Sequence, residues 1–142
     1  MQVDETVEID APPERVWQVL SDVEAWPTWT ESVRSVRLLD GGPLTEGSRV
    51  EVSQPKLPTA TWVVTELVEG QSFSWSARGP GVVSTADHEL EPVGAGTRVT
   101  LRFTQEGPLG SAVGRLAGGL VRRYVGLEAA GLKRHCEGRA AG

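Results

Sequence analysis

Residues 97–137 read TRVTLRFTQEGPLGSAVGRLAGGLVRRYVGLEAAGLKRHCE, and the hydrophobic period changes from 2 to 3.6 within this stretch. Before Gly107, apolar residues alternate with polar ones (V-T-L-R-F), which is typical of a half-buried strand. After Pro108, apolar residues recur at spacings of three and four, which predicts a long amphipathic helix over residues 109–137. The stretch therefore predicts a final strand that leads directly into a C-terminal helix.

The expected helix has one apolar stripe, with arginine and lysine on the opposite side. The stripe consists of Val113, Ala117, Leu120, Tyr124, Leu127 and Gly131, and it is widened by Leu116, Val121, Val125 and Leu132. Five glycines fall inside the helix, although a helical glycine costs about 1 kcal/mol relative to alanine. We expect these glycines either to let the helix approach the sheet closely or to leave space over a cavity.

The chain before this stretch begins with a strand at residues 3–9, where apolar and polar residues alternate. A short helix is predicted to start at the prolines before Glu14, because proline fits the first helical turn. A second helical turn is expected at residues 23–26 and is predicted to end at Pro27. From residue 32 to 103, about six strands alternate with turns, which favours an antiparallel meander with one wet face.

This order of elements predicts an α+β fold in one domain, residues 1–137, followed by a frayed tail at 138–142. A curved antiparallel sheet with one solvated face must cover its other face. The C-terminal helix is the one predicted element long enough to do so, and two short helices follow the first strand.

Composition limits the classes of function. The formal net charge of −5 disfavours a nucleic-acid partner, since a phosphate-backbone binder needs a basic face. No apolar run reaches the ~20 residues that cross a bilayer, so we expect no membrane insertion. The first residues, MQVDE, contain no signal peptide, and we expect a cytoplasmic location. The single cysteine, Cys136, has no evident activating partner.

Tryptophan is unusually frequent, with 5 residues against 2 phenylalanines and 1 tyrosine. A small core with several indoles, each with an N–H that needs a partner, is often wet or hollow. The sequence therefore favours an internal cavity, with plain core packing of these rings as the alternative.

Several local motifs occur in this order along the chain: IDAPPERVW at 9–17, LSD at 20–22, WPTW at 26–29, GTRVT at 96–100 and GLKR at 131–134. Together they resemble the polyketide cyclase/dehydrase branch of the START-like superfamily, also called SRPBCC or helix-grip. The resemblance spans essentially the whole chain. It implies a seven-stranded curved antiparallel sheet that grips the C-terminal helix, with a deep pocket for a hydrophobic or aromatic molecule between them.

The expected pocket residues lie on the concave face. We predict ligand contacts from the residues Trp26, Trp29, Trp62, Val64, Phe73, Trp75, Leu90, Phe103, Leu120, Tyr124 and Leu127. The resemblance also implies that Glu66 and Val68 face inward, on the same side of the strand as Trp62.

Three ionisable residues, Glu5, Glu66 and His88, interrupt apolar faces. Glu66 and His88 are candidate catalytic residues, since a buried carboxyl can act as an acid and a neighbouring histidine as a base. The alternative is that all three residues have structural roles only. Glu5 is then solvated, Glu66 binds water or an arginine, and His88 is a core residue whose hydrogen bonds are made within the protein. In aromatase/cyclases of the resembled family an inward arginine polarises carbonyls, and our approximate alignment places Glu66 at that position.

Two functions stay open at this point. The first is a carrier or sequestering protein for a hydrophobic or aromatic small molecule that is polyketide-like or lipid-like. The alternative is a polyketide aromatase/cyclase or dehydratase that uses Glu66 and His88 as an acid/base pair. A weaker third reading is a protein-interaction role. No motif predicts a cofactor or a metal site, and the ligand and oligomeric state are left open.

Overall fold

The computed structural model describes residues 1–138, apart from the side chain of Val113, so the tail expected at 138–142 lies outside the described residues except for Gly138. The elements in chain order are β1 (Gln2–Ile9), α1 (Pro13–Ser21), the 3-10 helix η1 (Val23–Thr28), β2 (Ser35–Leu38), β3 (Arg49–Ser53), β4 (Ala60–Val68), β5 (Ser72–Gly79), β6 (Val82–Val93), β7 (Gly96–Glu106) and α2 (Gly110–Cys136). Pro27 lies inside η1 and does not end it, because the turn continues through bonds from Trp29 and Thr30 to the Trp26 carbonyl.

The seven strands form one antiparallel sheet in the order β1-β7-β6-β5-β4-β3-β2. Successive hairpins connect β2 through β7, and β1 closes on β7 at the opposite edge. The meander and the predicted fold class are confirmed.

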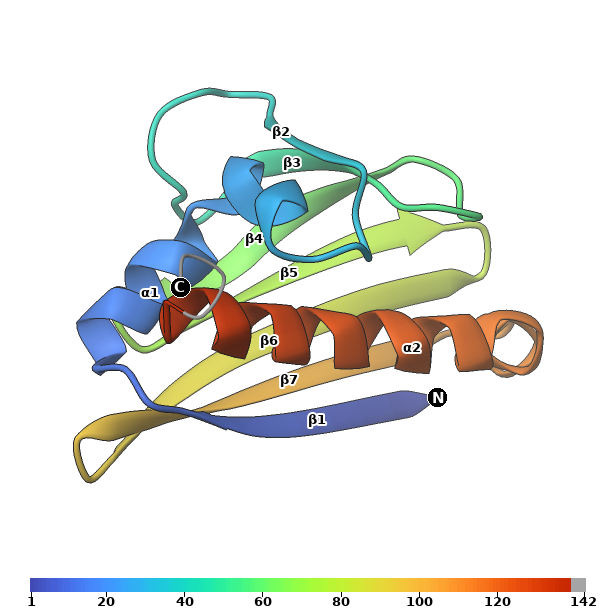
Figure 1. Cartoon of the computed structure of the whole chain (residues 1–142). Coiled ribbons are helices and arrows are strands. Elements are labelled where there is room, and N and C mark those ends of the chain that lie inside the picture. The colour runs from blue at the N-terminus through green and yellow to red at the C-terminus, as the bar shows by residue number, and fades with distance from the viewer. Residues whose placement is uncertain (139–142) are drawn as a thin grey trace.

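Helix α2 crosses the concave face of the sheet (Figure 1). It packs against β1, β7 and β6, and near its C-terminal end against α1. The 3-10 helix η1 packs against β2 at the other side of the sheet. Both α2 and η1 therefore cover the concave face, each over a different edge of the sheet.

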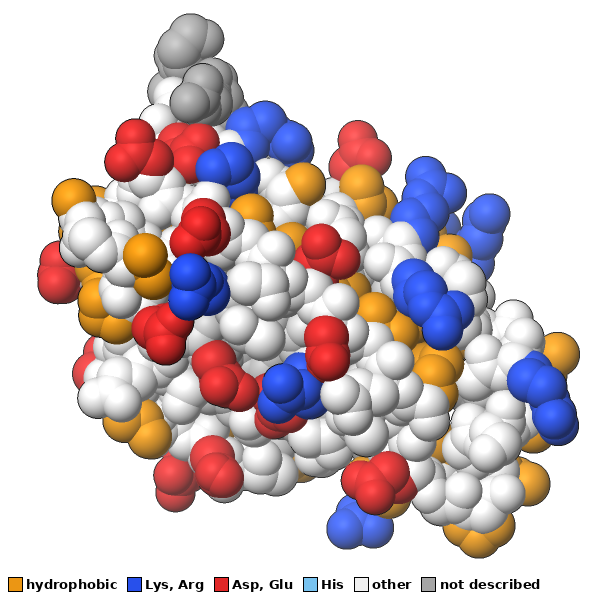
Figure 2. All heavy atoms as spheres, turned by 90° about the horizontal axis from the view of Figure 1, so that it is seen from below, with side chains coloured by type: hydrophobic (Ala, Val, Ile, Leu, Met, Phe, Trp, Pro, Cys, Tyr) orange, Lys and Arg blue, Asp and Glu red, His pale blue; other side chains and the backbone are white. Residues whose placement is uncertain are grey.

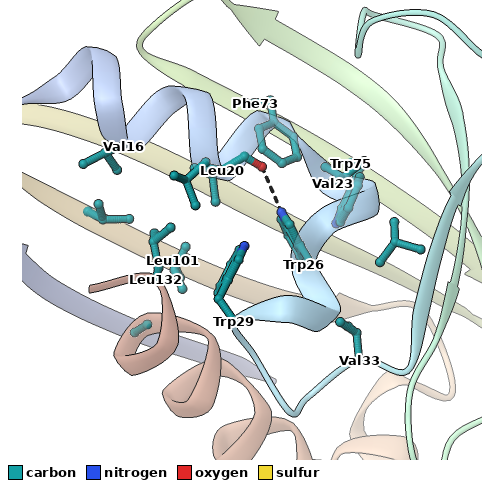
Figure 3. Close-up of a cluster of buried hydrophobic side chains, with 14 of the residues drawn as sticks. Val16, Leu20, Val23, Trp26, Trp29, Val33, Phe73, Trp75, Leu101 and Leu132 are labelled. Carbon is teal, nitrogen blue, oxygen red and sulfur yellow. Dashed lines mark hydrogen bonds between the residues drawn. The ribbon is translucent and has the colours of Figure 1, made fainter. Parts of the chain in front are cut away.

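The densest core lies under the C-terminal half of α2 (Figure 3). Leu132, Phe73 and Leu20 are completely buried there, and Trp26 is 2% exposed. The Nε1–H of Trp26 donates to the carbonyl of Leu20 at 2.9 Å, which ties η1 to α1. Burial of apolar surface at this end of the molecule stabilises the junction of α1, η1 and α2.

Gly131 lets α2 approach the chain that follows η1. A Cβ at this position would lie 2.0 Å from the carbonyl oxygen of Trp29, far inside van der Waals contact. One of the five helical glycines thus serves a close approach, made to a backbone carbonyl after η1 and not to the sheet. For Gly119 and Gly126, by contrast, no described atom outside the chain neighbours and the adjoining helix backbone lies within 4 Å of the added Cβ.

A bulge interrupts β4. Val64 pairs with Trp75 and Glu66 pairs with Ser74, so two steps along β4 oppose one step along β5. The extra residue reverses the alternation after Thr65, and both Glu66 and Val68 are exposed on the convex side. The prediction that Glu66 and Val68 face the helix is therefore wrong.

Among residues 1–138, no helix is both long enough and apolar enough to cross a bilayer.

Candidate functional site

A cavity of ≈ 680 Å³ lies between α2 and the concave face of the sheet. Its wall includes side chains from η1, from β3 to β7, and from the N-terminal two-thirds of α2. The main aromatic and ionisable lining residues are Trp26, Trp62, Trp75, His88, Phe103, Tyr124 and Glu128.

Four aromatic rings make a continuous wall. The ring centres of Trp26 and Trp75 are 5.4 Å apart, those of Trp75 and Trp62 6.0 Å, and those of Trp62 and Phe103 6.4 Å. These tilted and edge-on contacts are the preferred geometry of aromatic pairs. The wall gives a planar apolar ligand a rigid surface that loses little conformational entropy on binding.

One ionisable pair borders this aromatic wall. His88 is 3% exposed, and its Nε2 lies 3.6 Å from Oε1 of Glu128, whose side chain is 15% exposed. The His88 ring stacks on Phe73 with centres 4.1 Å apart and meets the edge of Trp75. The surrounding rings therefore hold the imidazole in one orientation beside the carboxyl group.

The hydrogen bonds of His88 assign its tautomer. Nδ1 lies 3.1 Å from the carbonyl oxygen of Phe73, which can only accept a hydrogen bond, so Nδ1 carries a proton. Nε2 then faces Glu128. Nε2 and Oε1 are 3.6 Å apart, so an imidazole protonated at both nitrogens would form an ion pair with the Glu128 carboxylate. Such a pair can give or take a proton at the cavity surface.

Some other polar groups at the cavity have no protein partner among the described residues. Gln105 donates from Nε2 to the hydroxyl of Ser84 at 3.2 Å, while its buried Oε1 has no partner among the described residues. Within the same residues, the indole N–H groups of Trp62 and Trp75 make no hydrogen bond. These groups leave hydrogen-bonding capacity for a ligand.

The mouth of the cavity lies at one end of the sheet. Its exposed lining residues include Pro58 and Thr59 in the β3–β4 loop, Arg78 at the end of β5 and Pro80 in the β5–β6 turn. The hydroxyl of Tyr124 donates to the carbonyl of Pro55, which fastens α2 to the β3–β4 loop beside this opening.

The family model for polyketide cyclase / dehydrase and lipid transport matches residues 1–137. The chain belongs to this family. This family assignment agrees with the resemblance that the sequence motifs indicate.

Solved structures share the fold of this family member. A hypothetical protein from Helicobacter pylori is 14% identical and superposes with a TM-score of 0.81 over 96% of this chain and 88% of its own. A protein from Thermus thermophilus is 22% identical, with a TM-score of 0.77 over 100% and 99%. The Zhui aromatase/cyclase from a Streptomyces species is 18% identical, with a TM-score of 0.74 over 99% and 95%. Among curated proteins, no sequence matches this chain.

In this member of the polyketide cyclase/dehydrase family, several predicted pocket residues line the cavity. They are Trp26, Trp62, Trp75, Phe103 and Tyr124, together with His88. The other predicted ligand contacts do not line it: Trp29, Val64, Phe73, Leu90, Leu120 and Leu127. Phe73 and Val64 lie in the core, and Leu90 borders a separate pocket of ≈ 450 Å³ near Gln71.

Trp29, a predicted ligand contact, is 5% exposed in the core, because Gly131 allows it to pack under α2. Its indole N–H has no partner among the described residues.

The phase of α2 explains the error at Leu120 and Leu127. The helix turns Val121, Val125 and Glu128 toward the cavity, so Leu120 and Leu127 lie near one edge of the helix and are half-buried. Sequence reasoning missed Glu128. The available signal was its spacing of seven residues from Val121, which places a carboxyl group on the apolar stripe.

The side chains Glu66 and His88 do not form the predicted acid/base pair, because Glu66 is exposed on the convex face. Glu128 takes the place next to His88. Cys136 offers no nucleophile, since burial raises the pKa of its thiol to about 11 and keeps it protonated at neutral pH.

Proposed function

We propose that this protein binds a hydrophobic or aromatic small molecule in the cavity and carries or sequesters it. The observation that supports this proposal is a hollow of ≈ 680 Å³ walled by Trp26, Trp62 and Trp75. Small-molecule sites are typically concave, roughly 300–1,000 Å³, mostly apolar, and supplied with a few polar groups. Side chains that only stabilised the fold would fill such a space, because protein interiors are close-packed.

Ligand binding can be tested by placing a larger side chain of α2 in the cavity. Ala117 lines the cavity, whereas Ala130 is exposed on the same helix. We expect Ala117→Phe to weaken binding of the apolar dye N-phenyl-1-naphthylamine at least about tenfold, since the new ring occupies ligand volume. Dye fluorescence measures the affinity, and mass spectrometry of co-purifying molecules identifies the natural ligand.

The matched control is Ala130→Phe, which adds the same ring to the same helix outside the cavity. Its dye affinity should equal that of the unmodified protein. If the unmodified protein does not bind the dye, or if both variants bind it equally well, the cavity is not the binding site.

A second candidate function is acid/base catalysis on the bound molecule, and the His88–Glu128 pair favours it. In this scheme His88 Nε2 or the Glu128 carboxylate removes a proton next to a ligand carbonyl and returns it to another position. General acid/base catalysis of this type contributes about 10²–10⁴-fold to a rate. Dehydration and aldol-type ring closure both need such proton transfers.

Proton exchange on a simple ketone tests this second function. The probe is 2-tetralone, a flat aromatic ketone with acidic protons next to its carbonyl. We expect the protein to accelerate uptake of deuterium from deuterium oxide, measured by NMR. His88→Gln and Glu128→Gln should each lower that acceleration about 100-fold while dye binding stays unchanged.

Glu66→Gln is the control, because it makes the same chemical change on the convex face. It should leave the exchange rate unchanged. If the protein accelerates no exchange, or if His88→Gln retains the full rate, the carrier function stands alone.

A further inference from the structure

The solvent face of α2 is cationic in a protein whose formal net charge is −5. The residues of α2 described as exposed are Ser111, Arg115, Leu116, Gly119, Arg122, Arg123, Ala130 and Arg134, and none of them is acidic. Glu128 points toward the cavity, and Glu106 lies before the helix on β7. The positive charge of this helix is therefore not offset on its own surface.

Among the described residues, Arg115, Arg122 and Arg123 make neither an ion pair nor a side-chain hydrogen bond. By contrast, Arg37, Arg49, Arg98 and Arg102 on the sheet all pair with carboxylates. Figure 2 shows this asymmetry from below: at the upper right, blue side chains lie among orange ones without red between them. Red side chains gather over the middle and the left of the same view.

Two large apolar side chains accompany these arginines. Leu116 is 90% exposed and Leu109 is 50% exposed, the two highest values among the large hydrophobic residues described. Leu109 lies against Gly81 in the β5–β6 turn, and Leu116 directly precedes Ala117, which lines the cavity. Both leucines therefore lie at the same end of the molecule as the mouth.

Two more cations flank the opening. Lys56 is exposed in the β3–β4 loop, next to lining residue Leu57, and Arg78 is exposed in the cavity wall near the β5–β6 turn. Neither makes an ion pair among the described residues. Cations from three separate elements thus surround one opening.

We propose that this surface, formed by Leu109, Leu116, Arg115, Arg122 and Arg123 with Lys56 and Arg78, docks the protein on an anionic lipid bilayer with the cavity mouth toward the lipid. Anionic headgroups complement the arginines, and the interfacial region buries the projecting leucines. A nucleic acid or an acidic protein would match the charge but would leave Leu116 without an apolar environment. Docking here would let an apolar ligand pass between bilayer and cavity without crossing water.

Vesicle co-sedimentation tests the proposal with the whole chain. We expect binding to phosphatidylcholine vesicles that contain about 30% phosphatidylglycerol and none to phosphatidylcholine alone at about 0.1 M salt. Arg122→Gln/Arg123→Gln should weaken binding about tenfold or more, since each surface arginine contributes roughly fivefold. Leu116→Ser should weaken it several-fold, and about 0.5 M salt should remove the arginine-dependent part.

The matched control is Arg37→Gln/Leu39→Ser, which removes a cation and an exposed leucine near β2, the sheet edge opposite β1. It should bind vesicles as the unmodified protein does. All substituted residues are at the surface, so the thermal midpoint of unfolding should stay within about 2 °C in each variant.

Three outcomes would overturn the proposal. One is absence of binding to phosphatidylglycerol vesicles, and another is equal weakening by the control and the arginine variant. The third is that the protein binds soluble polyglutamate, or associates with itself, as tightly as it binds vesicles, and that Leu116→Ser does not change this affinity. Dye binding in the cavity is measured separately, so a failure here is distinct from a failure of the proposed ligand binding.

Discussion

Replacing Gly131 by alanine is expected to lower the free energy of unfolding by about 3 kcal/mol, although alanine is the better helix former. The new methyl group would lie 2.0 Å from the carbonyl oxygen of Trp29. That contact is with backbone, so relief requires α2 to move away from η1 and from the completely buried Leu132. Thermal unfolding should show a midpoint lower by roughly 10 °C.

Gly126→Ala is the matched control on the same helix. Apart from the chain neighbours and the adjoining helix backbone, no described atom lies within 4 Å of its added Cβ, so the gain in helix propensity should stabilise the protein by about 0.5–1 kcal/mol. The two identical substitutions are thus expected to have opposite signs. If Gly131→Ala proved neutral, the close approach of α2 to Trp29 would not exist in solution.

Phe73→Ala is expected to cost about 4 kcal/mol of stability. Phe73 is completely buried, stacks on His88 and meets the edge of Trp17 and Trp75. Its removal opens a void that surrounding rings cannot fill. Denaturant unfolding measures the loss, and Phe73→Leu, at about 1.5 kcal/mol, remains measurable if the alanine variant does not fold.

Trp62→Ala separates the cavity wall from the core. Trp62 borders existing empty space, so its truncation should cost less stability, about 2 kcal/mol, yet weaken dye binding at least about tenfold. Phe73→Leu should keep dye affinity within about threefold. The reverse pattern, with binding lost in Phe73→Leu and kept in Trp62→Ala, would move the ligand site into the core.

Strand alternation predicted much of the concave face from the sequence. The period of two turned Trp62, Trp75 and His88 inward as expected, because each strand is solvated on one side only. The change of period at Gly107 predicted both the last strand and the covering helix. The strands and the helix could be predicted because each depends on the order of apolar and polar residues within one short segment, which a single sequence contains.

The errors arise where the answer depends on contacts between distant segments. The wide apolar stripe of α2 fits several rotations of the helix, and packing against β1, β7 and β6 selects the one that turns Glu128 inward. Trp29 is buried because Gly131 is opposite it, a pairing across about a hundred residues. The spacing of residues within one helix or strand therefore predicts neither the rotation of α2 nor the burial of Trp29.

The bulge at Thr65 in β4 bears on how the inner surface of this fold can change in evolution. If β4 paired with β5 without the bulge, strict alternation of the same residues would turn Glu66, in place of Leu67, to the concave side. Gain or loss of this bulge can therefore change which side chains this part of the strand presents there without altering any residue. Relatives with identical letters around this point can thus differ in the inner surface they present.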